Sequence, residues 1–258
     1  MAGRQVAIEG NSRAADRRAL KLDNPLVVQW EYASEERLAK RNAAYRQLVE
    51  GPNAEEIVFA AVAEANPSRV LEVGCGTGEL AERIQRELGA TVVAVDLSPR
   101  MVSLAAERGI DARLADAQEL PFADGEFDCV VAGWVLYHLP DVDRGISELV
   151  RVLEPGGTFV AGTLGADNFL ELWELLGDPR TDTPTFGREN GKEWLERHFP
   201  EVEFRDAQGV AVFPDRDAMR TFVAVTITHA HLADRVRELD EPFRARTSHA
   251  VFVARKPR

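Results

Sequence analysis

Apolar and polar positions alternate with two periods along this chain, and the change of period predicts where strands give way to helices. Between the strands, apolar residues recur at helical spacing, as at Leu80, Ile84 and Leu88. Strands that alternate with helices of about ten residues predict a parallel sheet covered by helices on both faces. Short valine-rich runs predict buried strands over 70–73, 92–96, 127–133 and 158–160.

The segments that flank this alternating core have looser patterns. A helical pattern over 24–49 ends at Gly51-Pro52, and a helix that Asn53 caps is expected to reach Ala65. Another helix is marked by Ile146, Leu149, Val150 and Leu153. Beyond residue 163, helices are predicted over 169–176, 189–198 and 215–239, and strands over 202–204 and 249–254.

The most informative motif follows the first strand, where Val70–Leu80 reads VLEVGCGTGEL. Gly74, Gly76 and Gly78 permit left-handed backbone angles and a close approach of ligand to backbone. Dinucleotide dehydrogenases space their glycines as G-x-G-x-x-G around a pyrophosphate. Here the glycines alternate, and Glu79 occupies the third dehydrogenase glycine position, which disfavours a pyrophosphate.

Two acids and an aromatic turn follow the next strands in order. Asp96 lies about twenty residues beyond the glycines, where a carboxylate can hold two ribose hydroxyls. The alternative is that Asp96 caps the next helix, although Ser98 and Pro99 already suit that role. A further strand is expected to end near Leu114, and Asp116 follows it, with an exposed turn acid as the alternative. Residues 127–141 read FDCVVAGWVLYHLPD.

Together these motifs, from about Val70 to Thr163, resemble those of the class I S-adenosylmethionine (SAM)-dependent methyltransferases. The resemblance implies a doubly wound, Rossmann-like sheet of seven mostly parallel strands, with 202–204 and 249–254 as an antiparallel hairpin at its edge. It also implies SAM as cofactor and S-adenosylhomocysteine as product, with the ribose on Asp96 and the adenine amino group on Asp116. The cofactor contacts expected from the resemblance are Glu72, Gly74, Cys75, Gly76, Gly78, Asp96, Leu97, Met101, Asp116, Ala117, Gln118, Gly133 and Trp134.

Methyl transfer from a sulfonium is a backside displacement, to which a protein contributes mainly alignment and exclusion of water. A general base is needed only for an acceptor that starts protonated. His138 is the candidate catalytic base, because it follows the active-site strand and imidazole titrates near neutral pH. The alternative is a structural histidine in the turn before Pro140. Tyr32 and Tyr45 are candidate substrate contacts, or residues that only dock their helix on the core.

The chain is interpreted as one methyltransferase domain over 24–258, preceded by a mobile tail over 1–23 that is polar and arginine-rich. Within the domain, 24–52 is expected to form a helical lid and 53–164 the cofactor-binding core. Residues 165–258 are expected to complete the sheet and to supply substrate-binding helices that help to roof the active site.

Composition limits the partners. A net charge of -12 disfavours a nucleic acid substrate, and no apolar run is long enough to span a membrane. Two cysteines, Cys75 and Cys129, are too few for a secreted disulfide framework or an iron–sulfur cluster, and a cytoplasmic location is expected. His229 and His231 point to different faces of a predicted helix, so no metal site is predicted.

A small molecule is therefore the expected methyl acceptor, and the oligomeric state is left open. Two alternatives are a non-catalytic SAM-binding protein, because methyl transfer needs no obligatory catalytic side chain, and a nicotinamide-dependent oxidoreductase, which shares the arrangement of strand, glycine turn and acid. Hydrolase chemistry is disfavoured because no G-x-S-x-G motif follows a strand.

Overall fold

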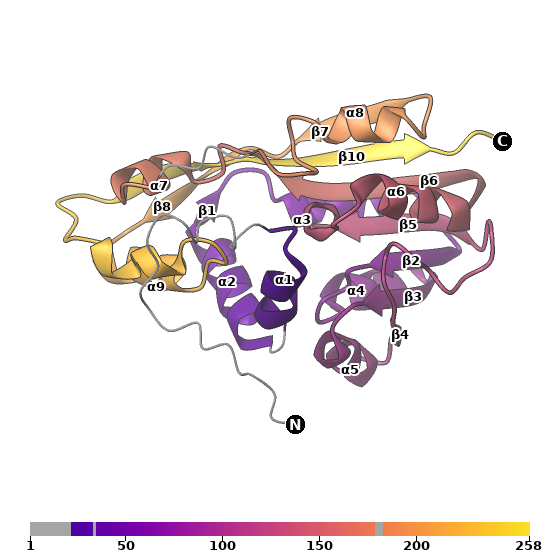
Figure 1. Ribbon diagram of the computed structural model, residues 1–258, viewed down its shortest axis with the longest axis horizontal. Helices are drawn as coiled ribbons and strands as arrows, with labels where there is room; N and C mark the ends of the chain where they lie inside the picture. The colour runs from indigo at the N-terminus through magenta and orange to yellow at the C-terminus, as the bar shows by residue number, and fades with distance from the viewer. Residues whose placement is uncertain (1–21, 33–34, 179–182) are drawn as a thin grey trace, which may run out of the picture.

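The computed structural model describes residues 22–32, 35–178 and 183–258 (Figure 1), so the tail expected over 1–23 falls almost entirely outside them. In the described part, seven strands form the main sheet in the order β4-β3-β2-β5-β6-β10-β7. These strands are β2 (Arg69–Val73), β3 (Thr91–Asp96), β4 (Asp111–Leu114), β5 (Phe127–Gly133), β6 (Leu153–Leu164), β7 (Val202–Asp206) and β10 (His249–Arg255).

The main sheet confirms the doubly wound architecture. Strands β2 to β6 pair in parallel, whereas β10 is antiparallel to both β6 and β7, one position in from the β7 edge. Strand β2 has β3 on one side and β5 on the other, so the strand order reverses there. Ligands of open parallel sheets bind at the carboxyl ends of the strands at such a point.

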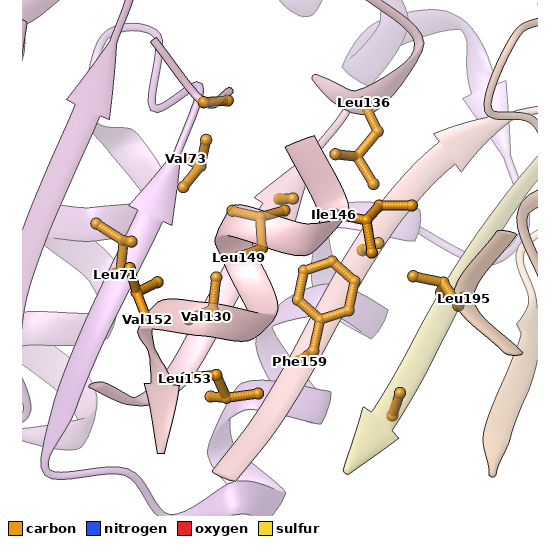
Figure 2. Packing of buried hydrophobic residues seen from close by; sticks show 14 of the residues in the cluster. Leu71, Val73, Val130, Leu136, Ile146, Leu149, Val152, Leu153, Phe159 and Leu195 are labelled. Atoms are coloured by element: carbon orange, nitrogen blue, oxygen red, sulfur yellow. The ribbon is translucent and has the colours of Figure 1, made fainter. Parts of the chain in front are cut away.

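Helices cover both faces of this sheet. On one face lie α3 (Ala54–Ala65), α4 (Glu79–Leu88) and α5 (Pro99–Glu107), and on the other α6 (Val142–Val152) and α8 (Gly191–Glu196). Figure 2 shows Ile146 and Leu149 of α6 among the side chains of the sheet, close to Val130 and Phe159. The alternation of apolar side chains along each strand therefore supplies two separate hydrophobic layers.

Local signals set several helix ends as the sequence predicts. The Ser98 side chain caps α5 by accepting from Met101 N, and Asn53 caps α3 by accepting from Glu55 N. The helix expected to include Leu153 ends one residue earlier, and this residue instead begins β6. The register of β5 against β6 shifts between Phe127 and Cys129, which accommodates the Pro-Gly-Gly sequence inside the strand.

A second, three-stranded sheet was not predicted. It contains β1 (Val49–Glu50), β8 (Gly209–Phe213) and β9 (Phe243–Thr247) in the order β1-β8-β9. The helix expected over 215–239 is instead α9 (Arg216–Ala224) and the 3₁₀ helix η3 (Ala230–Arg235). Strands β7 and β10 pair as expected. The segment that connects them is an insertion that contains β8, α9, η3 and β9.

The second sheet has its own hydrophobic cluster, which includes Trp173 of α7 (Leu170–Leu175), Phe213 and Phe222. The insertion leaves and rejoins the main sheet at one place, because Gly209 pairs with Thr247 in the β8–β9 ladder. Helices α1 (Pro25–Glu31) and α2 (Glu35–Leu48) take the place of the single helix expected over 24–49. In Figure 1 they lie between the α9 side of the molecule and the α4–α5 side.

Candidate active site

A cavity of about 830 Å³ lies at the carboxyl ends of β2, β3 and β5, and α1 and α2 also border it. Its volume is in the range of small-molecule sites. Of the candidate site residues, Gly78 and Met101 are absent from its wall in the described structure. Those that border it are Tyr32, Tyr45, Glu72, Gly74, Cys75, Gly76, Asp96, Leu97, Asp116, Ala117, Gln118, Gly133, Trp134 and His138.

The glycine turn that follows β2 has a conformation that few other residues can adopt. Gly74 has φ +70°, and a Cβ built there would lie 2.5 Å from Cγ2 of Val135. Both Gly74 N and Cys75 N donate to Val95 O, at 2.8 and 3.1 Å. The turn is therefore fastened to β3, and its glycine lets the backbone pass beneath Val135.

Gly78 and Met101 have packing roles that explain why they lie away from the cavity. A Cβ on Gly78 would lie 2.8 Å from the Cβ of Ala105, so this glycine lets α4 approach α5 closely. Met101 is fully buried in the first turn of α5, where its backbone N donates to Ser98 Oγ. Gly78 thus serves the packing of two helices, and Met101 lies in the interior.

The Asp96 carboxylate is held by the backbone at the end of β3. Its Oδ2 accepts from Gly76 N at 2.9 Å, and its Oδ1 accepts from Ser98 N at 2.8 Å. Burial raises the pKa of Asp96, and these hydrogen bonds oppose the rise. Each oxygen keeps a second lone pair, which suits a pair of hydroxyl donors.

Asp116 is oriented by the turn that follows β4. Its Oδ1 accepts from Gln118 N at 2.8 Å and from the Gln118 side-chain amide at 3.2 Å. Gln118 Oε1 in turn accepts from Asp141 N at 3.0 Å, which fixes the orientation of the amide. The carboxylate is thus held in the cavity wall, unlike a free acid in an exposed turn.

Glu72 is a buried carboxyl group with one oxygen left unpaired. It accepts a hydrogen bond from Ala81 N–H, whereas its Oε2 has no partner among the described residues. Burial raises the pKa of Glu72 to about 8. A carboxylate of this kind in a cavity wall suits a cationic group of a ligand, and SAM carries an ammonium and a sulfonium. The residues present therefore fit SAM.

His138 lies in the turn after β5 and contacts the first helix of the expected lid. Its Nδ1 lies 2.7 Å from Leu22 O, which can only accept, so Nδ1 carries the proton. Its Nε2 then accepts from Tyr32 O–H at 3.1 Å. Burial lowers the pKa of His138 to about 4. A weakly basic imidazole with an occupied lone pair favours the structural alternative for this residue.

The far end of the cavity is aromatic, and the sequence reasoning missed most of it. Trp134 Nε1 donates to His249 Nδ1 at 3.0 Å, and Tyr45 lies edge-on to the His249 ring with centroids 5.4 Å apart. Trp173 stacks on His229, with ring centroids 4.0 Å apart. One feature of the sequence could have revealed His249. The last strand was expected to be antiparallel, and this direction brings its first residue, His249, beside Leu164 at the end of β6.

A buried ion pair behind α1 was also missed. Glu31 is almost fully buried and pairs with Arg41 at 2.5 Å and Arg37 at 3.3 Å. Arg41 borders the cavity. Trp30, by contrast, is half exposed and lies under the Arg37 guanidinium, away from the cavity wall. The charged residues of α1 and α2 thus hold the two helices together beside the site.

Residues 71–161 match a family model described as a methyltransferase domain. A demethylmenaquinone methyltransferase of Thermobifida fusca is 33% identical over 171 residues, which cover 62% of this chain and 69% of that protein. This chain belongs to the class I SAM-dependent methyltransferases. SAM is accordingly its cofactor. None of the helices in the described residues combines the length and apolar character that crossing a membrane requires.

A further relative and a solved structure are also similar to this chain. The demethylmenaquinone methyltransferase of Thermus thermophilus is 40% identical over 104 residues, covering 38% of this chain and 47% of that protein. The crystal structure of a putative methyltransferase from Bacillus halodurans covers 79% of this chain and 100% of its own, with 21% identity and a TM-score of 0.60. The first match spans under half of the Thermus protein, and the second shows the fold.

Proposed function

We propose that this methyltransferase acts on a small aromatic acceptor, which binds at the end of the cavity bordered by Tyr45, Trp134, Phe169 and Trp173. The observation that carries the proposal is that one cavity joins these rings to the glycine turn and its carboxylates. Aromatic walls favour flat, largely apolar ligands. The relatives named for methylation of demethylmenaquinone, a small molecule, support the same class.

The residues that would hold SAM each match one of its groups. Glu72 would face a cationic group, Asp96 the ribose hydroxyls and Asp116 the adenine amino group, with Leu97, Ala117 and Gln118 beside the ring. SAM supplies an electrophilic methyl group on a sulfonium sulfur. The remaining contribution of the protein is to align the acceptor atom with that methyl group and to exclude water.

Helices α1 and α2 are proposed as a lid over both ligands. Three contacts support this role: Ser98 Oγ donates to Tyr32 O at 2.6 Å, Tyr32 O–H donates to His138, and Arg46 pairs with Glu79 at 2.6 Å. Tyr32 and Tyr45 both border the cavity, as substrate contacts would. A general-base role for His138 stays a prediction, and in it the proton would pass through the Tyr32 hydroxyl.

The test combines binding with label transfer. We expect calorimetry to detect SAM binding to the wild-type protein, and Asp96→Ala to abolish it. Asp124→Ala is the matched control, because Asp124 is an exposed acid that pairs only with Arg151 on the surface among the described residues. Wild-type protein should move labelled methyl from SAM to a member of a panel of phenols and hydroxylated aromatics.

Two outcomes separate the alternatives. SAM binding without label transfer to any small molecule would favour a non-catalytic SAM-binding protein. If Asp96→Ala binds SAM as tightly as wild type does, the assignment of the SAM site to this cavity would be contradicted. Membership of the SAM-dependent family decides against the nicotinamide-dependent alternative. A cytoplasmic location and the lack of a nucleic acid partner stay predictions from composition.

A further inference from the structure

Trp134 has a backbone conformation that bulky residues rarely adopt. Its φ is +57°, in the left-handed region, and its N donates to Gly162 O at 2.8 Å. Such strain persists where the surrounding structure imposes it, and it clusters at functional sites. The indole also lies against Gly162, where a Cβ would be 3.4 Å from the ring. The backbone of this turn thus places the indole beside β6, facing the start of β10.

The indole fixes the protonation of His249. An indole N–H can only donate, so His249 Nδ1, 3.0 Å from Trp134 Nε1, must be the unprotonated nitrogen. The neutral ring then carries its proton on Nε2. That atom is buried and has no hydrogen-bond partner among the described residues. The side chain is 7% exposed, and the residue borders the cavity. A buried donor without a partner is unfavourable, so a ligand that accepts from it gains affinity.

We propose that Trp134 and His249 orient the methyl acceptor, with His249 Nε2–H donating a hydrogen bond to a hydroxyl or carbonyl oxygen on its aromatic ring. This inference rests on the proposed function and names the chemistry of its substrate. His249 is a binding residue, because its only free nitrogen already carries a proton and cannot take another. Trp134 acts through His249 and is a positioning residue.

The surroundings of the pair favour an aromatic ring as the carrier of that oxygen. Tyr45 meets both His249 and Phe169 edge-on, with ring centroids 5.4 and 6.1 Å apart. Phe169, Trp134 and Tyr45 all border the same cavity. Apolar rings exclude water from the Nε2–H donor, which strengthens its preference for a ligand oxygen. A ligand without an oxygen would leave that donor unpaired.

The experiment compares two probes of similar shape, 4-chlorophenol and 4-chlorotoluene, of which only the first carries an oxygen, by calorimetry on the full chain saturated with S-adenosylhomocysteine. We expect wild-type protein to bind the phenol roughly tenfold more tightly, the effect of one buried hydrogen bond. His249→Phe should remove this preference and leave S-adenosylhomocysteine affinity unchanged. Trp134→Phe keeps the ring but lacks the N–H, so its preference should fall between the two. His198→Gln, remote on the surface, should behave as wild type.

Three results would overturn the inference: no phenol binding, equal affinity for both probes, or an undiminished preference in His249→Phe. A second measurement, on wild-type protein, keeps the inference testable even if a variant fails to fold. Nitrogen-15 NMR of the histidine ring should show the proton on Nε2, and that signal should shift when 4-chlorophenol is added. A proton on Nδ1 would also overturn it. If wild-type protein does not bind S-adenosylhomocysteine, that result would instead count against the proposed function.

Discussion

The two ends of the cavity are built in different ways. The cofactor end comes from one stretch of chain, from β2 to the turn after β5, and backbone N–H groups of Gly76, Ser98 and Gln118 orient its carboxylates. The aromatic end is assembled from side chains of α2, β10 and three other segments. Local sequence therefore encodes the first end, whereas the second depends on how distant elements pack.

The two ends also leave opposite hydrogen-bonding groups unpaired. Among the described residues that border the cavity, Glu72 and His249 are the two with a buried side-chain atom that lacks a partner. Glu72 Oε2 is an acceptor that suits a cation, and His249 Nε2–H is a donor that suits an oxygen. Each end thus has a polar position that a ligand would complete, and the two ligands would not compete for it.

The strongest test of the cofactor end is Gly74→Ala. The new Cβ would meet Val135 at 2.5 Å in a backbone with φ +70°, so we expect a loss of about 2–5 kcal/mol in the free energy of unfolding and no measurable SAM binding. Gly89→Ala is the matched control, because Gly89 has the same φ but no atom within 4 Å of its Cβ position. It should bind SAM as wild type does. Equal behaviour of the two variants in urea unfolding would contradict this explanation.

The unpaired acid at the same end predicts a pH dependence of SAM binding. Because the pKa of Glu72 is raised to about 8, the unliganded protein holds a proton there that a cationic ligand must displace. Affinity should therefore rise with pH by up to about tenfold per unit below pH 8 and level off above it. Glu72→Gln should bind more weakly and show no such rise in calorimetry between about pH 6 and 8. A parallel rise in the variant would exclude Glu72 as the source.

His138 lies between the cofactor end and the lid, and a variant at this position distinguishes a structural role from a catalytic one. His138→Gln should lower kcat less than about tenfold with any acceptor found by label transfer, whereas loss of a general base costs about 10² to 10⁴. The folded pKa of about 4 lies below the ordinary histidine pKa of 6.5, so this histidine contributes stability that is lost as pH falls from 6.5 towards 4. Urea unfolding of the variant should show a shallower decline in that window. A loss of kcat beyond hundredfold would restore the catalytic role.

The smallest expected effect concerns the lid contact at Ser98. Ser98→Ala removes both the α5 cap and the hydrogen bond to Tyr32 O, and Asp215→Ala removes only the cap of α9. Each should lower the free energy of unfolding by about 1 kcal/mol. Only Ser98→Ala should speed dissociation of S-adenosylhomocysteine, by roughly threefold to tenfold in stopped-flow measurements. Equal dissociation rates would argue against a lid.

The contrast between the ends explains what the sequence could predict. Asp96 was found because it ends the valine-rich strand β3. The role of Asp116 came from the family resemblance, because β4 reads DARL and has no clear apolar pattern. The parallel topology brings the two strand ends together. Gly78 and Met101 were expected at the cofactor because the resemblance includes them, yet neither borders the cavity among the described residues. Sequence spacing identifies a turn more reliably than it identifies which of its side chains face the ligand.

The second sheet shows where such prediction stops. Strands β8 and β9 are short, and their pairing joins distant residues, such as Gly209 and Thr247. No local period signals a contact of that kind, and the residues between the two strands, 215–239, were predicted as one long helix. His249 was predicted only as part of a strand. Its hydrogen-bond partner Trp134 lies 115 residues earlier, so no local spacing connects the two residues.

The insertion between β7 and β10 leaves and re-enters the main sheet at a single point, since Ala207 N donates to His249 O at 3.2 Å where the chain returns. A chimaera that replaces 209–247 with the equivalent segment of another methyltransferase would therefore have its two chain junctions side by side, although the new segment would also have to pair with β1. Such an exchange would change the shape of the chamber that receives the acceptor. It would keep His249, which lies outside the exchanged segment. The preference for an acceptor with a ring oxygen and the shape of that acceptor could therefore be engineered separately.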